Sequence, residues 1–226
     1  MTAGAGNRPG NLRSGMKTVL CFGDTNTWGV NPVDESRLEF EKRWTGILTE
    51  ELRGEARVIE EGQCGRTTVC DDPVDLYKNG LDYLMPCLDS HRPLDAVVVM
   101  LGTVQLKGRF NQSAADITLG MERILQAILH AGCGVNGNAP KVLLISPIRI
   151  GKVEESHLAS TFFLHNNRER QAEMKPLYSA LAERYGVEFL AAEDFAKTST
   201  LDGIHIDVES HRTFALAVAD KLRRML

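Results

Sequence analysis

The sequence is short of the features that mark several large classes of protein. Its longest apolar run, Ala96–Leu101, is far too short to span a membrane. The five cysteines are an odd number with no Cys-x-x-Cys pair, which argues against a disulfide framework and favours a reducing compartment. A net charge of −4 leaves no basic excess for nucleic acid. We therefore expect a cytoplasmic protein that binds neither nucleic acid nor membrane.

Sequence motifs for cofactors and metals are missing as well. No Gly-x-Gly-x-x-Gly follows a predicted strand, and no Gly-x-x-x-x-Gly-Lys-Ser/Thr is present, so neither a dinucleotide nor a nucleoside triphosphate is indicated. The histidines lack the spacing of His-Glu-x-x-His. We expect no cofactor and no catalytic metal.

The composition is that of an ordinary globular protein, with 226 residues, 43% hydrophobic and 25% charged. Residues 1–15 are rich in glycine, with asparagine, proline and arginine, and are predicted to be a disordered tail. Residues 16–226 are long enough for one domain with a substantial core.

Short apolar runs alternate with amphipathic segments along that domain. The runs predict buried strands at Thr18–Phe22, Arg57–Glu60, Ala96–Leu101, Lys141–Ser146 and Val187–Leu190. Helical periodicity marks Trp44–Leu52, Leu76–Ser90, Ala114–Ala131, Asn167–Tyr185 and Val208–Leu226. This alternation predicts an α/β fold, a three-layer α/β/α sandwich around a parallel, flavodoxin-like five-stranded sheet.

Two long loops, Asn31–Lys42 and Ile148–Asn166, fall on the side of the carboxyl strand ends. Lids and specificity loops are found on that side. A solvent-exposed loop without such a role is an equally good interpretation of the second one.

Two segments near opposite ends of the chain carry the chemistry. Gly23-Asp24-Thr25 ends the first apolar run, and Asp202-Gly203-Ile204-His205 precedes the last helical pattern. A hydroxyl at a strand end, with a histidine that has its own carboxylate, makes a relay of nucleophile, base and orienting group. The alternatives are a threonine that merely satisfies a turn and an aspartate near a helix N-cap beside an exposed histidine.

A series of blocks resembles the SGNH (GDSL-type) hydrolases, in particular the arylesterase/acyltransferase and carbohydrate acetylesterase branch. The resemblance spans residues 17–226. It rests on Cys21–Gly29, Arg43-Trp44-Thr45-Gly46, Glu60-Glu61-Gly62, Arg66-Thr67-Thr68, Met100-Leu101-Gly102-Thr103 and Asp202–His205.

The resemblance implies roles for particular residues. The family's nucleophilic serine falls on Thr25, and Asp202 and His205 match its Asp-x-x-His block. Gly65 matches a residue whose backbone N–H serves the oxyanion hole, together with the N–H of Thr25. The family's oxyanion asparagine falls on Val104, which has no donor, so that hydrogen bond is lost.

Three further residues are expected to contribute to substrate binding: Asp24, Trp28 and Thr103. For Asp24 we expect hydrogen bonds to the backbone of the strand-end loop. Trp28 follows the nucleophile turn, where lining an acyl pocket and simple packing are both reasonable. Cys64, beside Gly65, is interpreted as an inert thiol because nothing in the sequence places a base near it.

The departures limit what the site can do. The threonine methyl crowds the attacked carbon, and a missing oxyanion donor costs ~10²–10³ in turnover. Our first hypothesis is a hydrolase of small acyl esters, acetyl above all, on aryl, alkyl or carbohydrate alcohols, with possible acyl transfer. The alternative is a non-catalytic binding protein on this fold, natural or altered by design. The resemblance also implies a homo-oligomer.

Overall fold

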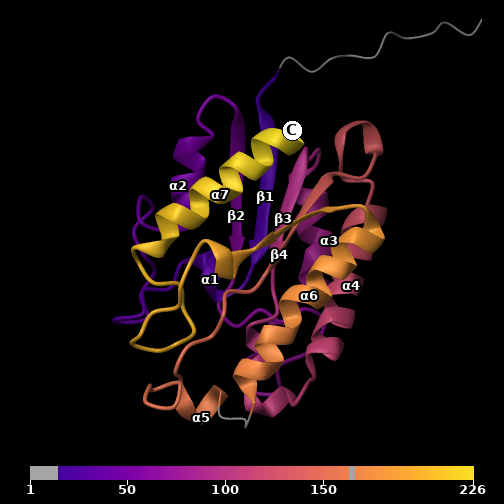
Figure 1. Cartoon of the computed structure of the whole chain (residues 1–226). Coiled ribbons are helices and arrows are strands. Elements are labelled where there is room, and N and C mark those ends of the chain that lie inside the picture. The colour runs from indigo at the N-terminus through magenta and orange to yellow at the C-terminus, as the bar shows by residue number, and fades with distance from the viewer. Residues whose placement is uncertain (1–14, 163–165) are drawn as a thin grey trace, which may run out of the picture.

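The computed structural model describes residues 15–162 and 166–226 of the chain (Figure 1). Of the predicted tail, residues 1–14 lie outside the described residues, and so do residues 163–165 of the second long loop.

Five parallel strands form a single sheet in the order β2-β1-β3-β4-β5. The strands are β1 (Lys17–Gly23), β2 (Ala56–Gly62), β3 (Ala96–Met100), β4 (Lys141–Ser146) and β5 (Glu188–Ala191). Each run of β-branched and aliphatic residues became a strand because both faces of a parallel sheet are buried. The order is that of flavodoxin-like sheets, so the predicted fold class is confirmed.

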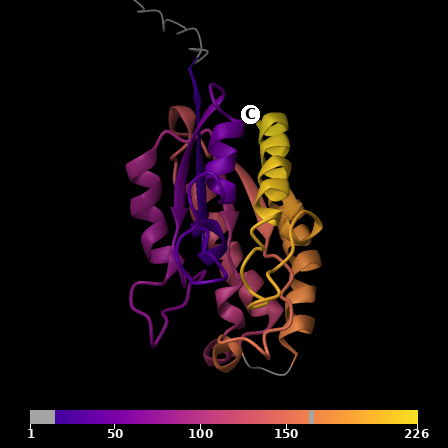
Figure 2. The same ribbon diagram turned by 90° about the vertical axis from the view of Figure 1, so that its left-hand side faces the viewer.

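Helices cover both faces of the sheet (Figures 1 and 2). They are α1 (Thr25–Trp28), α2 (Trp44–Glu51), α3 (Gly80–His91), α4 (Ala114–His130), α5 (Ala159–Phe162), α6 (Asn167–Tyr185) and α7 (Ser210–Met225), with short 3₁₀ turns η1 (Val104–Leu106), η2 (Gly108–Phe110), η3 (Val135–Gly137) and η4 (Ala192–Asp194). One apolar core joins the sheet to α3, α4 and α6, and a second joins it to α2 and α7. The result is the three-layer sandwich that the alternation predicts.

The predicted helix at Leu76–Ser90 begins four residues later than expected. Its actual N-cap is Asn79, whose side chain accepts a hydrogen bond from the N–H of Leu81 at 3.1 Å. Tyr77 has φ +62°, which no helix accommodates. An asparagine N-cap is a strong signal for a helix start, but the apolar pattern that begins at Leu76 favoured an earlier one.

Within the described residues, no helix is both long and apolar enough to cross a membrane. All five cysteines lie in this part of the chain, and each is a free thiol.

Helix α2 begins without a capping side chain of its own. Arg43 occupies the N-cap position and makes no side-chain capping bond. Instead, the N–H of Trp44 donates to Nδ1 of His211 on α7 at 3.1 Å. His211 is 1% exposed, and burial lowers its pKa from 6.5 to about 4. The neutral ring therefore joins the two helices of this layer.

This contact predicts a pH-dependent loss of stability. His211 is neutral in the fold but takes up a proton near its usual pKa when unfolded, so its contribution is complete above pH 6.5 and disappears as pH falls toward 4. Between pH 7.5 and 4.5 the loss from this residue is roughly 2–3 kcal/mol of unfolding free energy. Urea unfolding at both pH values measures it.

The matched variant is His211→Asn, which keeps an acceptor for the Trp44 N–H but does not titrate in this range. Other acid-sensitive groups are common to both proteins. The variant should therefore lose less stability on acidification by that same roughly 2–3 kcal/mol. Equal losses in the two proteins would refute this assignment.

Candidate active site

The carboxyl ends of three neighbouring strands bring the sequence motifs together. Gly23, the last residue of β1, pairs with Gly62 of β2 and with Met100 of β3. The chain segments that follow these strands contain Thr25, Gly65 and Val104 respectively. The sheet register alone therefore places Thr25, the candidate nucleophile, between the segments that contain Gly65 and Val104.

Asp24 starts helix α1 and shapes the turn that presents Thr25. Its Oδ1 accepts a hydrogen bond from the N–H of Asn26 at 3.0 Å, as an N-cap side chain does. The residue is 1% exposed, and burial raises its pKa to about 6 despite that bond and the nearby charges of His205 and Arg66. The expected bond to the backbone is present.

His205 and Asp202 form a buried pair. Nδ1 of His205 lies 2.8 Å from Oδ2 of Asp202, and Asp202 Oδ1 accepts from the N–H groups of Ile204 and His205 at 2.8 and 2.9 Å. Burial alone would raise the pKa of Asp202, but the His205 contact and these N–H donors hold it below its usual value. An ionised Asp202 fixes the ring so that Nε2 is free to act as a base.

Asn26 joins the nucleophile turn to the histidine loop. Its Nδ2 donates to the carbonyl of Ile204 at 3.3 Å, and its Oδ1 accepts from the N–H of Ile206 at 2.9 Å. It is 3% exposed. Sequence reasoning included Asn26 in a motif but gave it no role, because nothing in the sequence indicates which distant backbone an amide side chain binds.

The hydroxyl of Thr25 faces the Gly65 backbone in the segment that follows β2. The N–H of Gly65 lies 3.5 Å from Thr25 Oγ1, a long hydrogen bond. Gly65 has φ +78°, a conformation that favours glycine. Because Thr25 is the first residue of α1, its own N–H has no acceptor within the helix. In the described part of the chain no hydrogen bond joins Thr25 Oγ1 to His205.

Val104 is the first residue of η1, in the segment that follows β3, and is 3% exposed. Its neighbour Gln105 carries an amide, but that side chain is fully buried and donates to Thr68 Oγ1 at 2.5 Å. Gln105 therefore does not replace the missing donor.

One cavity of about 500 Å³ contains these groups. Thr25, Gly65, Thr103, Val104 and His205 all line it. Both long loops contribute to its wall, through Glu35 from the first and Leu158, Thr161 and Phe162 from the second.

The structure puts two expected substrate-binding residues elsewhere. Asp24 and Trp28 are absent from the lining of this cavity. The guanidinium of Arg37 covers the Trp28 ring at 5.3 Å from its centre, and Arg37 Nε donates to the Trp28 carbonyl at 2.9 Å. Trp28 therefore packs under the first long loop, and the aromatic side chain in the cavity wall is Phe162.

Several charged side chains line the cavity. Lys107 and Arg109 make ion pairs with Asp72 and Asp75. Lys78 also lines the cavity, and its aliphatic chain lies where a Cβ on Gly65 would contact it at 3.4 Å. Among the described residues no ion pair involves Lys78, so its charge is available to the cavity.

Cys64 also lines the cavity, as a half-buried thiol. Burial, reinforced by Asp24, raises its pKa to about 11, so the thiolate that a cysteine nucleophile requires is scarce. Within the described residues, the side chains of Glu61, Cys87 and His91 could hold a metal ion. None of these three lines the cavity.

The Asn26 bridge predicts the effect of its removal. Asn26→Ala leaves the buried Ile206 N–H and Ile204 carbonyl without partners and should cost roughly 2–4 kcal/mol of unfolding free energy. Asn138→Ala, which removes an exposed hydrogen bond to Val135, should cost less than about 0.5 kcal/mol. Urea unfolding compares the two, and equal small losses would show that the bridge is dispensable.

Comparison with known proteins identifies the family of the chain. The model of the GDSL-like lipase/acylhydrolase family matches residues 21–212. The structure of the M. smegmatis aryl esterase is similar, with 38% identity over 93% of this chain and 100% of that one, at a TM-score of 0.87.

Two solved structures from Sinorhizobium meliloti are also similar. Est24, a carbohydrate acetylesterase, has 39% identity over 93% of this chain and 100% of its own, with a TM-score of 0.87. A carbohydrate acetylesterase family member has 33% identity over 93% and 99%, with a TM-score of 0.86. A search of the curated proteins finds no match. The chain therefore belongs to the GDSL-like lipase/acylhydrolase family, a family of ester hydrolases.

Proposed function

We propose that this protein hydrolyses small acyl esters, acetyl esters above all, of aryl, alkyl or carbohydrate alcohols. The observation that carries the proposal is that one cavity of about 500 Å³ is lined by Thr25, Gly65 and His205, and that the His205 ring is paired with the buried Asp202. Similar proteins described as an aryl esterase and a carbohydrate acetylesterase support this choice of substrates.

In the proposed reaction, Thr25 Oγ1 attacks the ester carbonyl while Nε2 of His205 takes the hydroxyl proton. The carbonyl π electrons move to oxygen and form the oxyanion. When the tetrahedral intermediate collapses, the C–O bond to the alcohol breaks and His205 returns the proton to the leaving oxygen. Water then attacks the acyl-threonine by the same route, releasing the carboxylic acid and restoring Thr25. Asp202 stabilises the imidazolium in both halves.

The hydroxyl must come within hydrogen-bond distance of His205 before it attacks, because its one hydrogen bond among the described residues is the bond it accepts from the Gly65 N–H. Catalytic hydrogen bonds are often long or absent until substrate binds. The methyl group stiffens χ1 of threonine and makes this rotation harder than for serine.

The oxyanion is held by the N–H groups of Thr25 and Gly65 in our proposal. Val104 contributes no hydrogen bond, and the missing donor costs ~10²–10³ in turnover. The Lys78 ammonium, whose aliphatic chain runs beside Gly65, adds a favourable potential at the same place. This charge offsets part of the loss, so Lys78→Met should slow the enzyme more than Lys78→Arg does.

The second candidate is a non-catalytic binding protein on the same fold. The Val104 side chain, which faces the cavity without a donor, is the observation that favours it. In this alternative the cavity binds an ester or a related small molecule, and Thr25 serves only the turn.

Acyl transfer to an alcohol requires that water be scarce near the acyl-enzyme. Apolar side chains of Val30, Leu158, Phe162 and Ile204 line the cavity and favour this activity. Free thiols throughout support a cytoplasmic location.

We further propose a homo-oligomer. Val74, Leu76 and Tyr77, on the loop that contributes Lys78 to the cavity, are 68%, 73% and 89% exposed. A second copy of the chain would cover these apolar side chains. Light scattering on the purified protein tests this assembly.

Repair of the two altered positions tests the catalytic proposal. Thr25→Ser removes the crowding methyl group, and Val104→Asn restores an amide donor. Adding Val104→Asn to the Thr25→Ser variant should raise turnover of p-nitrophenyl acetate by ~10²–10³. The gain should appear in kcat with KM little changed, because the donor acts on the transition state.

His205→Ala in the repaired protein is the control and should abolish the gain. Val104→Leu in the Thr25→Ser background changes the side chain without adding a donor and should give no increase. A repaired protein as inert as the original chain would remove the enzyme hypothesis and favour the binding protein.

A further inference from the structure

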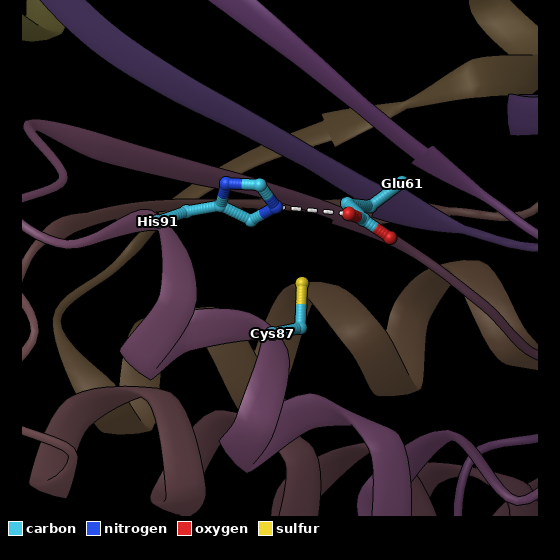
Figure 3. A group of neighbouring side chains, drawn as sticks. All are labelled: Glu61, Cys87 and His91. Atoms are coloured by element: carbon cyan, nitrogen blue, oxygen red, sulfur yellow. Dashed lines mark hydrogen bonds and ion pairs between the residues drawn. The ribbon is translucent and has the colours of Figure 1, made fainter.

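A second cluster of reactive side chains lies outside the cavity. Glu61, at the end of β2, and Cys87 and His91, on α3, bring a carboxylate oxygen, a sulfur and an imidazole nitrogen within 4.8 Å of one another. Nε2 of His91 is 3.0 Å from Oε1 of Glu61. Figure 3 shows the Cys87 thiol pointing toward the space between the ring and the carboxylate. The proposed ester hydrolysis uses none of these residues.

The helix geometry explains why these groups meet. Cys87 and His91 are four residues apart, so they occupy the same face of α3, which here packs on the strand that carries Glu61. Tyr83 lies one turn earlier on that face and donates to Glu61 Oε2 at 3.2 Å. A tyrosine that holds the second carboxylate oxygen leaves the first one aimed at the cluster, as outer-shell partners of metal ligands do.

The distances are close to those of a tetrahedral zinc site. Metal–ligand bonds of about 2.0–2.3 Å place neighbouring ligand atoms roughly 3.3–3.6 Å apart. The Glu61–His91 separation of 3.0 Å is close to that value, and the sulfur has at most about 1 Å to move, because all three ligand atoms lie within 4.8 Å of one another. The His91 and Glu61 side chains are 25% and 18% exposed, so an ion can enter from their side, while Cys87 is 2% exposed and closes the cluster from beneath.

The ligand types favour a borderline transition metal over magnesium or calcium, which prefer oxygen ligands alone. Arg66 opposes any cation, since its guanidinium lies over the Tyr83 ring at 5.2 Å and donates to the Glu61 carbonyl. A thiolate and a carboxylate together balance the two charges of the metal, so the site remains suited to such an ion.

We propose that Glu61, Cys87 and His91 form a binding site for a divalent transition metal ion such as Zn²⁺, with water as the fourth ligand. The ion joins α3 to the end of β2, four residues before Gly65 in the chain. It stands apart from the cavity and acts on stability, so it does not depend on the proposed function.

Metal titration of the chelator-treated full-length protein tests the site. Calorimetry with Zn²⁺ should show one ion per chain, and an excess of about 100-fold over Kd should raise Tm by roughly 5–10 °C. Co²⁺ in place of Zn²⁺ should produce a near-ultraviolet thiolate-to-metal absorption band. Cys87→Ser should abolish the band, whereas Cys70→Ser, at a half-buried cysteine outside the cluster, should retain it.

Since Cys87 is buried, its replacement could disturb folding, and two accessible variants keep the test decisive. His91→Gln and Glu61→Gln should each weaken Zn²⁺ binding by about 10–100-fold while the circular dichroism of the metal-free protein is unchanged. The proposal is overturned if the original protein shows neither Zn²⁺ heat nor a Co²⁺ band, if both accessible variants bind Zn²⁺ as the original does, or if the band persists in folded Cys87→Ser.

Discussion

The site depends on the side chain of Asn26, which holds together two parts of the chain that are distant in sequence. The nucleophile turn follows the first strand, whereas Asp202 and His205 belong to a loop after the last one. The Asn26 amide binds the backbone on both sides of His205, through Ile204 and Ile206. Each partner is buried, so a lost bond would leave a polar group unpaired at a cost of about 1–3 kcal/mol. The position of the base relative to Thr25 follows from this bridge.

Much of the fold could be predicted from the sequence because parallel strands are buried on both faces. The run Lys141–Ser146 was predicted to the residue. Helix boundaries were harder, since α3 starts at a side-chain cap on Asn79 while the apolar pattern begins earlier. Apolar patterns in the sequence indicate well which residues are buried, but they indicate poorly where a side-chain hydrogen bond starts or ends a helix.

The sequence brings together only some of the residues that line the candidate site. Thr25, Gly65, Thr103, Val104 and His205 could be grouped because the resemblance to the SGNH hydrolases implies roles for them in one site, and in the structure they line one cavity. The contributions of Lys78, Phe162 and Asn26 could not be predicted, because they depend on how loops fold back over the sheet. Trp28 was expected near substrate on proximity in sequence alone, yet Arg37 covers it. The cluster of Glu61, Cys87 and His91 has no sequence spacing that marks a metal site, since one ligand comes from a strand and two from a helix.

The proposed site combines an intact His205–Asp202 pair with an oxyanion hole that lacks one side-chain donor. The buried Asp202 carboxylate remains ionised and holds the His205 ring, so this pair can accept and return a proton. In our proposal, two backbone N–H groups and the charge of Lys78 stabilise the oxyanion. Residues of one catalytic unit combine non-additively, so the threonine and valine penalties do not simply multiply. The expected result is a slow ester hydrolase.

The central claim is that Thr25 is a nucleophile that His205 activates. Covalent trapping with a serine-reactive fluorophosphonate, read by intact mass and peptide mapping, tests it most directly because it needs no turnover. The account predicts one adduct per chain, located on Thr25, absent from Thr25→Ala and strongly slowed in His205→Ala. A protein that stays unmodified at Thr25 under prolonged exposure, while the Thr25→Ser variant is labelled, would contradict the claim.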